Sequence, residues 1–235
     1  MRPEVGAASI AGRMSLKIIG GSFGGRVLRS VRGLGTRPLL GQVRESLFNI
    51  LQEEIPGAVV WDLFAGTGAS GIEALSRGAA RVLFCEKNGK ALDVLRGNLQ
   101  MLGPDAVERS VVVRADAWDP PPMTPATFGG DGDVGAGAEV APNVVFLDPP
   151  YAMVAEDPVK SIARAQRLLA RTAAGGVVVF HFAAGVLDED DFDGDLDVDL
   201  REWGSTAIAM MWRAGEAPER VRRRQERQRE RQDDA

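Results

Sequence analysis

The stretch "DLFAGTGASGIEA", residues 62–74, decides the fold. The apolar run that leads into it reads as a buried strand, and the residues from position 69 onward have helical spacing. Between them Gly66, Gly68 and Gly71 form the pattern G-x-G-x-x-G, in which glycine permits a tight turn and close approach of a ligand. Glu86 ends the next predicted strand, where a carboxylate can accept hydrogen bonds from both hydroxyls of a ribose. The stretch therefore predicts a strand–turn–helix unit that binds a nucleotide or nucleoside.

The alternation of apolar strands and amphipathic helices continues along the chain. Strands are predicted at 58–64, 81–86, 110–116, 143–148 and 176–182, and helices at 42–54, 69–78, 89–102 and 158–170. Continuous apolar strands that alternate with helices are typical of a mostly parallel, doubly wound sheet, so the predicted fold class is α/β. Segments 195–203 and 205–213 alternate with a period of two and predict an antiparallel hairpin that closes one edge of the sheet.

The chain divides into a core and several extensions. Residues 1–13 are predicted to be a flexible leader, and residues 14–54 a small β-hairpin followed by a helix. The core domain spans residues 55–213 and carries a flexible, Pro/Gly-rich insertion at 119–142. The tail, 214–235, is charged throughout, which fits a solvated helix or a disordered segment and leaves an RNA-binding role open.

The composition excludes several classes of site. One cysteine among 235 residues rules out an intramolecular disulfide and a cysteine zinc cluster, and a single histidine gives little support for a metal site or a Ser-His-Asp triad. We find neither a long apolar run that would span a membrane nor a convincing signal peptide. We therefore expect a cytoplasmic protein that contains no metal and has no membrane partner.

Basic residues are concentrated in the first fifth of an acidic protein. The net charge is −5, yet residues 1–50 contain eight arginines and lysines against two glutamates, while residues 185–202 contain nine acids against one arginine. A charge run is often only a solvated face, but a local basic segment also suits a phosphate backbone. The candidate RNA contacts are Arg26, Arg29, Arg32, Arg37 and Arg44.

Acidic residues around the glycine turn favour S-adenosylmethionine over a dinucleotide. A dinucleotide would place its pyrophosphate at the helix N-terminus, where Asp62, just before the turn, would repel it. Asp62 could instead bind the ammonium of a methionyl group, directly or through water. Asp116, at the end of the third strand, could accept from an adenine amino group or simply cap a helix. The same cofactor pocket is expected to include the neighbouring residues Phe64, Ala65, Lys87 and Ala117.

The stretch "VVFLDPPYA", residues 144–152, ends the fourth strand in an unusual corner. Strand four should lie beside strand one, so its carboxyl end faces the ligand crevice of a doubly wound sheet. Asp148 and the carbonyl of Pro149 could accept hydrogen bonds from an exocyclic amine, while the prolines stiffen the loop and Tyr151 stacks on a planar base. Two acceptors would orient the amine and stabilise the charge that develops as a methyl group arrives. The predicted catalytic residues are Asp148, Pro149, Pro150 and Tyr151.

Four blocks of sequence together resemble one known family. "DLFAGTGASGIEALSRGA", "FCEKN", "VVFLDPPYA" and the upstream "IIGGSFGGRVLRS…GLGTRP…VRESLFNIL" are similar to the RsmD-like family, the bacterial 16S rRNA (guanine-N2)-methyltransferases. The resemblance implies a single Rossmann-like domain with an N-terminal hairpin, S-adenosylmethionine as methyl donor, and a guanine exocyclic amine in small-subunit rRNA as acceptor. It also implies cofactor roles for Asp62, Gly66, Gly68, Glu86 and Asp116.

The resemblance also implies how the partner is bound. It places Arg37 in a loop near the target, so residues 14–54 are expected to face the RNA. The expected partner is 16S rRNA or an assembling small ribosomal subunit, bound by a monomer.

Three alternatives remain open from the sequence. An adenine-N6 methyltransferase acting on DNA or another RNA would use the same chemistry on a different base. A nicotinamide-dependent dehydrogenase would use the glycine turn, although Asp62 and the Asp-Pro-Pro-Tyr corner disfavour it. A ribosome-assembly factor that has kept a nucleoside pocket but lost catalysis is the non-enzymatic alternative.

Overall fold

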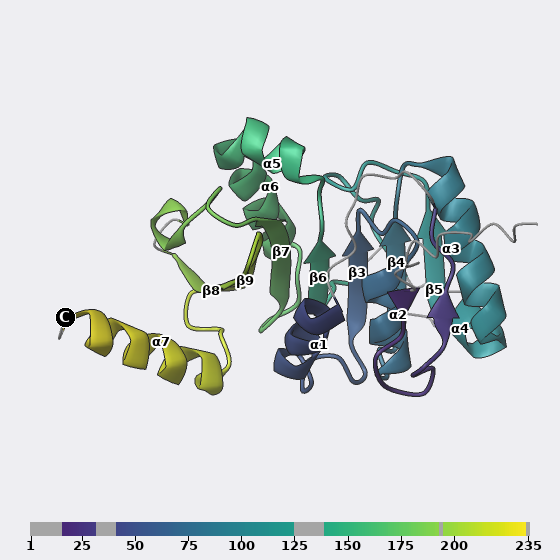
Figure 1. Ribbon diagram of the computed structural model, residues 1–235, viewed down its shortest axis with the longest axis horizontal. Helices are drawn as coiled ribbons and strands as arrows, with labels where there is room; N and C mark the ends of the chain where they lie inside the picture. The colour runs from purple at the N-terminus through teal and green to yellow at the C-terminus, as the bar shows by residue number, and fades with distance from the viewer. Residues whose placement is uncertain (1–15, 32–40, 125–138, 193–194, 234–235) are drawn as a thin grey trace, which may run out of the picture.

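A seven-stranded sheet in the order β5-β4-β3-β6-β7-β9-β8 organises the molecule (Figure 1). The computed structural model describes residues 16–31, 41–124, 139–192 and 195–233. The strands of the sheet are β3 (Val59–Leu63), β4 (Arg81–Cys85), β5 (Ser110–Val113), β6 (Val144–Leu147), β7 (Val177–Ala183), β8 (Leu196–Trp203) and β9 (Thr206–Arg213). The helices are α1 (Gly41–Ile50), α2 (Ala69–Ser76), α3 (Gly89–Leu102), α4 (Pro104–Glu108), α5 (Tyr151–Glu156), α6 (Pro158–Ala170) and α7 (Glu219–Asp233).

The structure confirms the predicted α/β sheet and its C-terminal edge hairpin. β3 pairs in parallel with β4 on one side and with β6 on the other, so the chain order reverses between β3 and β6. β9 runs antiparallel to both β7 and β8, which puts the hairpin at the edge. Helices predicted at 89–102 and 158–170 match α3 and α6 residue for residue, whereas the short helices α4 and α5 were not predicted.

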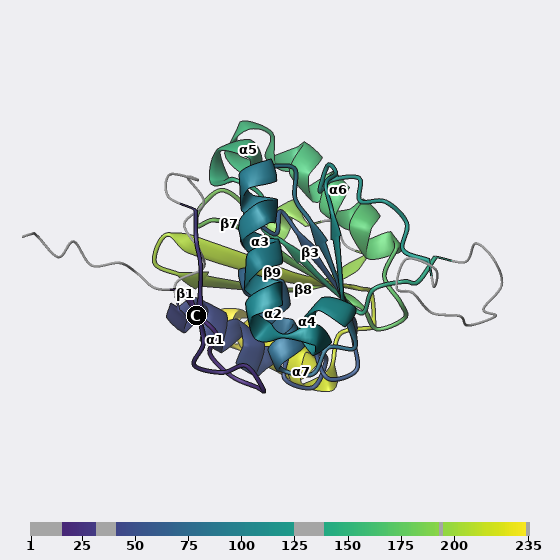
Figure 2. The ribbon, with the colours of Figure 1, turned by 90° about the vertical axis from the view of Figure 1, so that its right-hand side faces the viewer.

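Both faces of the central strands β3, β4, β6 and β7 are buried, which explains why these strands are almost continuous apolar runs. Alternate side chains point to opposite faces. Val60, Phe84 and Phe146 belong to the core beneath α1, α2 and α3, while Trp61 and Val145 belong to the core beneath α5 and α6. Figure 2 shows α1 and α6 on opposite sides of the sheet.

The predicted N-terminal hairpin is formed by β1 (Leu16–Lys17) and β2 (Val27–Leu28), and it docks on the C-terminal end of α2. The buried carboxylate of Glu73 accepts hydrogen bonds from the backbone N–H groups of Ile19 at 2.7 Å and Gly20 at 2.9 Å. Because α2 starts at the glycine turn and runs away from it, the hairpin lies near the amino ends of the parallel strands. That end of the strands is opposite the one where the predicted cofactor and catalytic residues lie.

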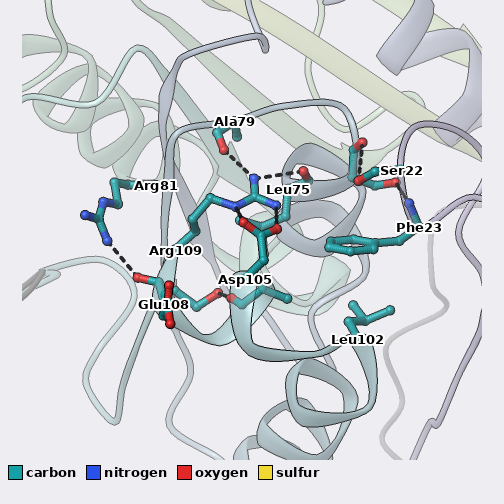
Figure 3. A network of polar contacts seen from close by, with 12 residues as sticks. Ser22, Phe23, Leu75, Ala79, Arg81, Leu102, Asp105, Glu108 and Arg109 are labelled. Atoms are coloured by element: carbon teal, nitrogen blue, oxygen red, sulfur yellow. Dashed lines mark hydrogen bonds and ion pairs between the residues drawn. The ribbon is translucent and has the colours of Figure 1, made fainter.

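One network of polar contacts connects α4 to α2 near the amino ends of the parallel strands, as Figure 3 shows. The Arg109 guanidinium donates to the carbonyl of Leu75 at 3.1 Å and to that of Ala79 at 2.8 Å, and it also pairs with Asp105. The last carbonyls of a helix lack intrahelical partners, so Arg109 supplies donors where α2 ends.

The charged tail forms helix α7, which settles the choice between helix and disorder for residues 219–233. Val221 is buried against the core, Arg224 pairs with the buried Asp199 of β8, and Arg220 pairs with Glu53 and Glu54.

The ends of the 119–142 insertion are held by the core. Met123 is buried, and the N–H of Val140 donates to its carbonyl at 2.6 Å. Residues 125–138 of the predicted insertion and the leader, 1–13, lie outside the described residues.

Candidate functional site

A cavity of about 690 Å³ opens where the carboxyl ends of β3, β4, β5 and β6 meet. It lies at the switch point of the sheet, the position where doubly wound folds bind ligands, and its size suits a small molecule. Its walls come from the glycine turn, the start of α3, the loop after β5, the corner after β6, and α5 and α6. The lining residues are Phe64, Gly66, Glu86, Lys87, Asn88, Ala91, Asp116, Trp118, Asp148, Pro150, Met153, Glu156, Asp157, Lys160, Ser161 and Arg164.

The three glycines of the turn have different roles. Gly66 lines the cavity and has a φ of 55°, so its backbone is open to a ligand. Gly68 has a φ of 89°, and a Cβ on it would come within 2.3 Å of Leu95 Cδ1. A Cβ on Gly71 would come within 2.3 Å of Phe84 Cε1. Gly68 and Gly71 are therefore required to shape and pack the turn, and neither lines the cavity, contrary to the expectation of direct cofactor contact.

Glu86 is fixed at the mouth of the turn by three backbone donors. Its Oε2 accepts from the N–H of Gly66 at 2.9 Å, and its Oε1 accepts from Lys87 at 2.8 Å and from Asn88 at 2.7 Å. An ionised carboxylate has about four lone-pair sites. One site therefore remains for a ligand hydroxyl, whereas acceptance from both hydroxyls of a ribose, as predicted, would need two; the ribose role of Glu86 stays a prediction.

Asp62 lies beneath the turn instead of in the cavity. It is 2% exposed, and its Oδ2 accepts the N–H of Gly71 at 2.8 Å. Burial raises its pKa well above the usual range, the Gly71 hydrogen bond opposes that shift, and the charges of Asp148 and Glu86 add to it. Its carboxylate holds the start of α2 and does not line the cavity, and the expected contact between Asp62 and the ammonium of a ligand stays a prediction.

The adenine side of the predicted pocket is formed by Asp116 and two aromatic rings. Asp116 is exposed and lines the cavity, and its Oδ1 also accepts the N–H of Trp118 at 3.0 Å, so it stabilises the local turn as well. The rings of Trp118 and Phe64 meet edge to face, with centroids 5.4 Å apart. Ala65 and Ala117, both predicted cofactor residues, are buried outside this wall.

The Asp-Pro-Pro-Tyr corner reaches the cavity only in part. Asp148 and Pro150 line it, whereas Pro149 is buried. Tyr151 begins helix α5, which lies above β7 at the top of Figure 1. Tyr151 is not among the described residues that line the cavity, and the stacking of its ring on a target base stays a prediction.

This corner has a partner that was not predicted, His181 of β7. Its Nδ1 lies 2.5 Å from Asp148 Oδ1, and its Nε2 lies 2.7 Å from the hydroxyl oxygen of Tyr151. The hydroxyl of Tyr151 is also 3.0 Å from Thr206 Oγ1. A sequence signal exists: His181 interrupts the apolar run "VVVFHF" on the same strand face as Val177 and Val179.

The predicted RNA contacts are dispersed in the structure. Arg26 is exposed but lies at the hairpin edge, where its guanidinium donates to the carbonyl of Leu102. The backbone of Arg29 is bound by Asn98, which also donates to the carbonyl of Thr67 in the glycine turn, so the chain after β2 returns toward the cavity. Arg32 and Arg37 lie outside the described residues.

The assignment of Arg44 to the RNA surface is wrong. Its side chain is packed in the core at 3% exposure, its guanidinium donates to the carbonyl of Lys17, and burial lowers its pKa. That assignment rests on the basic character of the segment 1–50, but in α1 Arg44 shares the inward face with Val43, Leu47 and Phe48.

A different set of cations borders the cavity. Lys160 and Arg164 of α6 line it, and Arg164, Arg167 and Arg171 line an adjoining cavity of about 430 Å³. Their spacing of four, three and four residues puts Lys160, Arg164 and Arg167 on one face of α6, and Arg171, the C-cap residue, continues that face. Arg171 is engaged with Glu139 and the carbonyl of Pro120, while Arg167 is exposed.

Within the ranges 16–31, 41–124, 139–192 and 195–233, no group of histidine, cysteine and acidic side chains has the arrangement of a metal site. In the same part of the chain no helix combines the length and the apolar character that crossing a bilayer requires.

Comparison with known proteins places the chain in a family. The model of the family described as "Conserved hypothetical protein 95" matches residues 16–182. "Putative rRNA methyltransferase YlbH" of Bacillus subtilis strain 168 is 36% identical over 136 residues, which are 58% of this chain and 67% of that protein. "Ribosomal RNA small subunit methyltransferase D" of Escherichia coli K12 is 36% identical over 141 residues, 60% of this chain and 63% of that protein. The matches thus span about two thirds of these relatives' length.

A solved structure agrees with this assignment. "Putative methyltransferase yhhF from Escherichia coli" superposes with a TM-score of 0.63 at 25% identity and covers 86% of this chain and 99% of that one. The seven-stranded sheet and the added two-stranded hairpin are therefore a Rossmann-like methyltransferase fold. With the family model matching well over half of its residues, the chain belongs to the family of conserved hypothetical protein 95, the RsmD-like proteins.

Proposed function

We propose that the protein transfers a methyl group from S-adenosylmethionine to the exocyclic N2 amine of a guanine in small-subunit (16S) rRNA. The observation that carries the proposal is that Asp148 and Pro150 open into the same cavity as Glu86 and Asp116. One region of the cavity thus offers acceptors for a nucleoside, and another offers an acceptor for an amine. The names of the similar proteins, which are rRNA methyltransferases, support rRNA as the substrate class.

The lining of the cavity fits S-adenosylmethionine, which when bound supplies a methyl group on a positively charged sulfur. Five acidic side chains face three basic ones there, a balance that favours a cationic ligand and opposes a pyrophosphate. Glu86 keeps one lone-pair site for a ribose hydroxyl, Gly66 leaves room for the ligand beside the turn, and Asp116 provides an acceptor near the aromatic wall. These features disfavour the nicotinamide alternative.

Asp148 supplies the chemistry on the acceptor side. A conjugated exocyclic amine is a weak nucleophile. A carboxylate that accepts a hydrogen bond from the amine N–H orients the nitrogen and stabilises the positive charge that the nitrogen gains. The amine nitrogen forms the new bond to the methyl carbon, the sulfur keeps the electron pair of the bond that breaks, and the nitrogen then loses one proton. Asp148 lies where it can accept that proton, since it is 31% exposed in the side chain and lines the cavity.

The cations of α6 support a polynucleotide as the acceptor. Lys160 and Arg164 lie at the reactive cavity, and Arg167 extends the basic face into the adjoining one. Arginines and lysines in a row beside a reactive site suit the phosphates that flank a target base. We include in the proposal that the protein acts as a monomer in the cytoplasm, on 16S rRNA or on an assembling small subunit.

A transfer assay with S-adenosylmethionine tritiated in its methyl group tests the function. The purified protein is incubated with total rRNA, with small subunits that lack the modification, and with DNA, and the products are digested to nucleosides. We expect label in N2-methylguanosine from the small subunit. Label in N6-methyladenosine would assign the adenine-N6 alternative, and donor binding without transfer to any substrate would favour the non-catalytic assembly factor.

A further inference from the structure

His181 connects the reactive corner to the rest of the fold. It is the single histidine of the chain, and it is 3% exposed in β7. Leu147 and Phe180 are register partners, so Asp148 and His181 follow them on neighbouring strands. The rings of His181 and Tyr151 also meet edge to face, with centroids 5.1 Å apart. One hydrogen-bonded chain thus joins the residue that follows β6 to side chains of α5, β7 and β9.

The direction of this chain follows from its members. An ionised carboxylate only accepts, so His181 Nδ1 carries the proton that is donated to Asp148 Oδ1. In the neutral ring Nε2 is then an acceptor, which the hydroxyl of Tyr151 satisfies as donor at 2.7 Å. Thr206, 3.0 Å away, completes the chain by donating to the hydroxyl oxygen of Tyr151.

We propose that His181 is a positioning residue for methyl transfer, a role that rests on the proposed function. By binding Oδ1, it fixes the Asp148 carboxylate and leaves Oδ2 to accept from the target amine in the cavity. Tyr151 anchors the far side of the imidazole, so its contribution to the site passes through His181. Without His181 the carboxylate would sample other rotamers, and a misplacement of about 1 Å in a reactive group can cost about 100-fold in rate.

Two substitutions separate the two nitrogens of the ring. His181→Asn puts an amide N–H near the position of Nδ1 and keeps the donor to Asp148, whereas His181→Gln reaches the position of Nε2 and keeps only the contact with Tyr151. We expect kcat to fall roughly 10- to 100-fold in His181→Gln and only about threefold in His181→Asn. KM for the RNA and the affinity for S-adenosylmethionine should stay near the wild-type values in both.

Thermal unfolding of the same variants distinguishes positioning from a structural role. If both variants lose kcat equally and in step with a lower Tm, His181 merely holds the fold and the proposal is wrong. If His181→Gln keeps the full kcat, the proposal is also wrong. A double mutant with Asp148→Ala adds a check, because removing the positioned group should make the His181→Gln effect disappear.

The imidazole can be observed directly, independently of turnover. Because His181 is the only histidine, the ¹⁵N-correlated imidazole spectrum of the tag-free protein contains its resonances alone. The arrangement predicts the Nδ1–H tautomer, and an Nε2–H tautomer would overturn it. If the wild type binds donor but methylates no substrate, the proposed function and the positioning role of His181 in methyl transfer both fail, while the spectrum still decides whether His181 holds Asp148.

Discussion

Replacing Glu86 by glutamine tests the donor side of the cavity with a change of one atom. Glu86 Oε1 accepts from the N–H groups of Lys87 and Asn88, and Oε2 accepts from that of Gly66. In glutamine one of these oxygens becomes an NH₂ group, which is a donor. Either orientation of the amide therefore sets donor against donor, at Gly66 or at the other two residues.

The expected loss follows from the number of lone pairs. Three of about four sites on the carboxylate are filled, so a ribose can gain one direct, charge-assisted hydrogen bond, with a value of about 1.5–3 kcal/mol. At 1.4 kcal/mol per tenfold change, Glu86→Gln should raise the Kd for S-adenosylmethionine roughly 10- to 150-fold. The kcat at saturating donor should not change, because Glu86 does not lie at the amine.

Isothermal titration with S-adenosylmethionine measures the Kd, and initial rates at saturating donor measure kcat. Asp93→Asn is a matched control, since it also removes one negative charge, but from a side chain of α3 that is 82% exposed. An unchanged Kd in Glu86→Gln, an equal rise in Asp93→Asn, or a large fall in kcat would each refute the ribose assignment.

Three further predictions concern the glycine turn, the buried aspartate and the RNA surface. Gly68→Ala should lower the free energy of unfolding by roughly 2–4 kcal/mol, because it combines a left-handed φ with a clash against Leu95. Gly97→Ala in α3, where nothing lies within 4 Å of the added Cβ, should instead raise the free energy of unfolding by up to about 1 kcal/mol. Chemical denaturation measures both variants, and equal effects would contradict the packing argument. Burial raises the pKa of Asp62 in the folded protein, so the stability that its protonated form contributes to the fold is complete below the ordinary pKa of about 4 and is lost as the pH rises. Asp62→Asn should therefore raise Tm relative to the wild type at pH 8 and not at pH 4, with donor affinity unchanged; a smaller Tm gain at pH 8 than at pH 4 would overturn this sign. Arg167→Gln should raise KM for RNA and reduce by about one the slope of log binding constant against log salt concentration. The same change at exposed Arg223 of α7 should alter neither quantity. Equal slopes in the two variants would show that Arg167 does not contact the RNA.

Local patterns explain what the sequence could predict. The glycine turn, the strand before it and Glu86 at the end of the next strand lie within a short stretch, and the structure brings Gly66 and Glu86 together at 2.9 Å. Parallel strands that alternate with helices have few possible arrangements, so the placement of β6 beside β3 followed from the fold class. Asp148 could therefore be assigned to the cavity before its surroundings were known.

Contacts between distant segments explain what the sequence could not predict. His181 lies 33 residues from Asp148, and Glu73 lies 54 residues from the backbone N–H that it binds. Nothing near either residue in the chain shows these partners. Arg44 demonstrates the opposite error, because a positive charge in a basic segment indicated the surface while helix packing buried it. The sequence shows that a segment is basic, but which of its charged side chains face solvent depends on how the chain folds.

The most direct test of the central claim is single-turnover methyl transfer by the wild type and Asp148→Ala, with donor saturating and the labelled nucleoside identified. We predict N2-methylguanosine from small-subunit rRNA with the wild type, and a rate lower by about 100-fold or more in Asp148→Ala with donor binding intact. Transfer by Asp148→Ala at the wild-type rate, or label in a different nucleoside, would contradict the account.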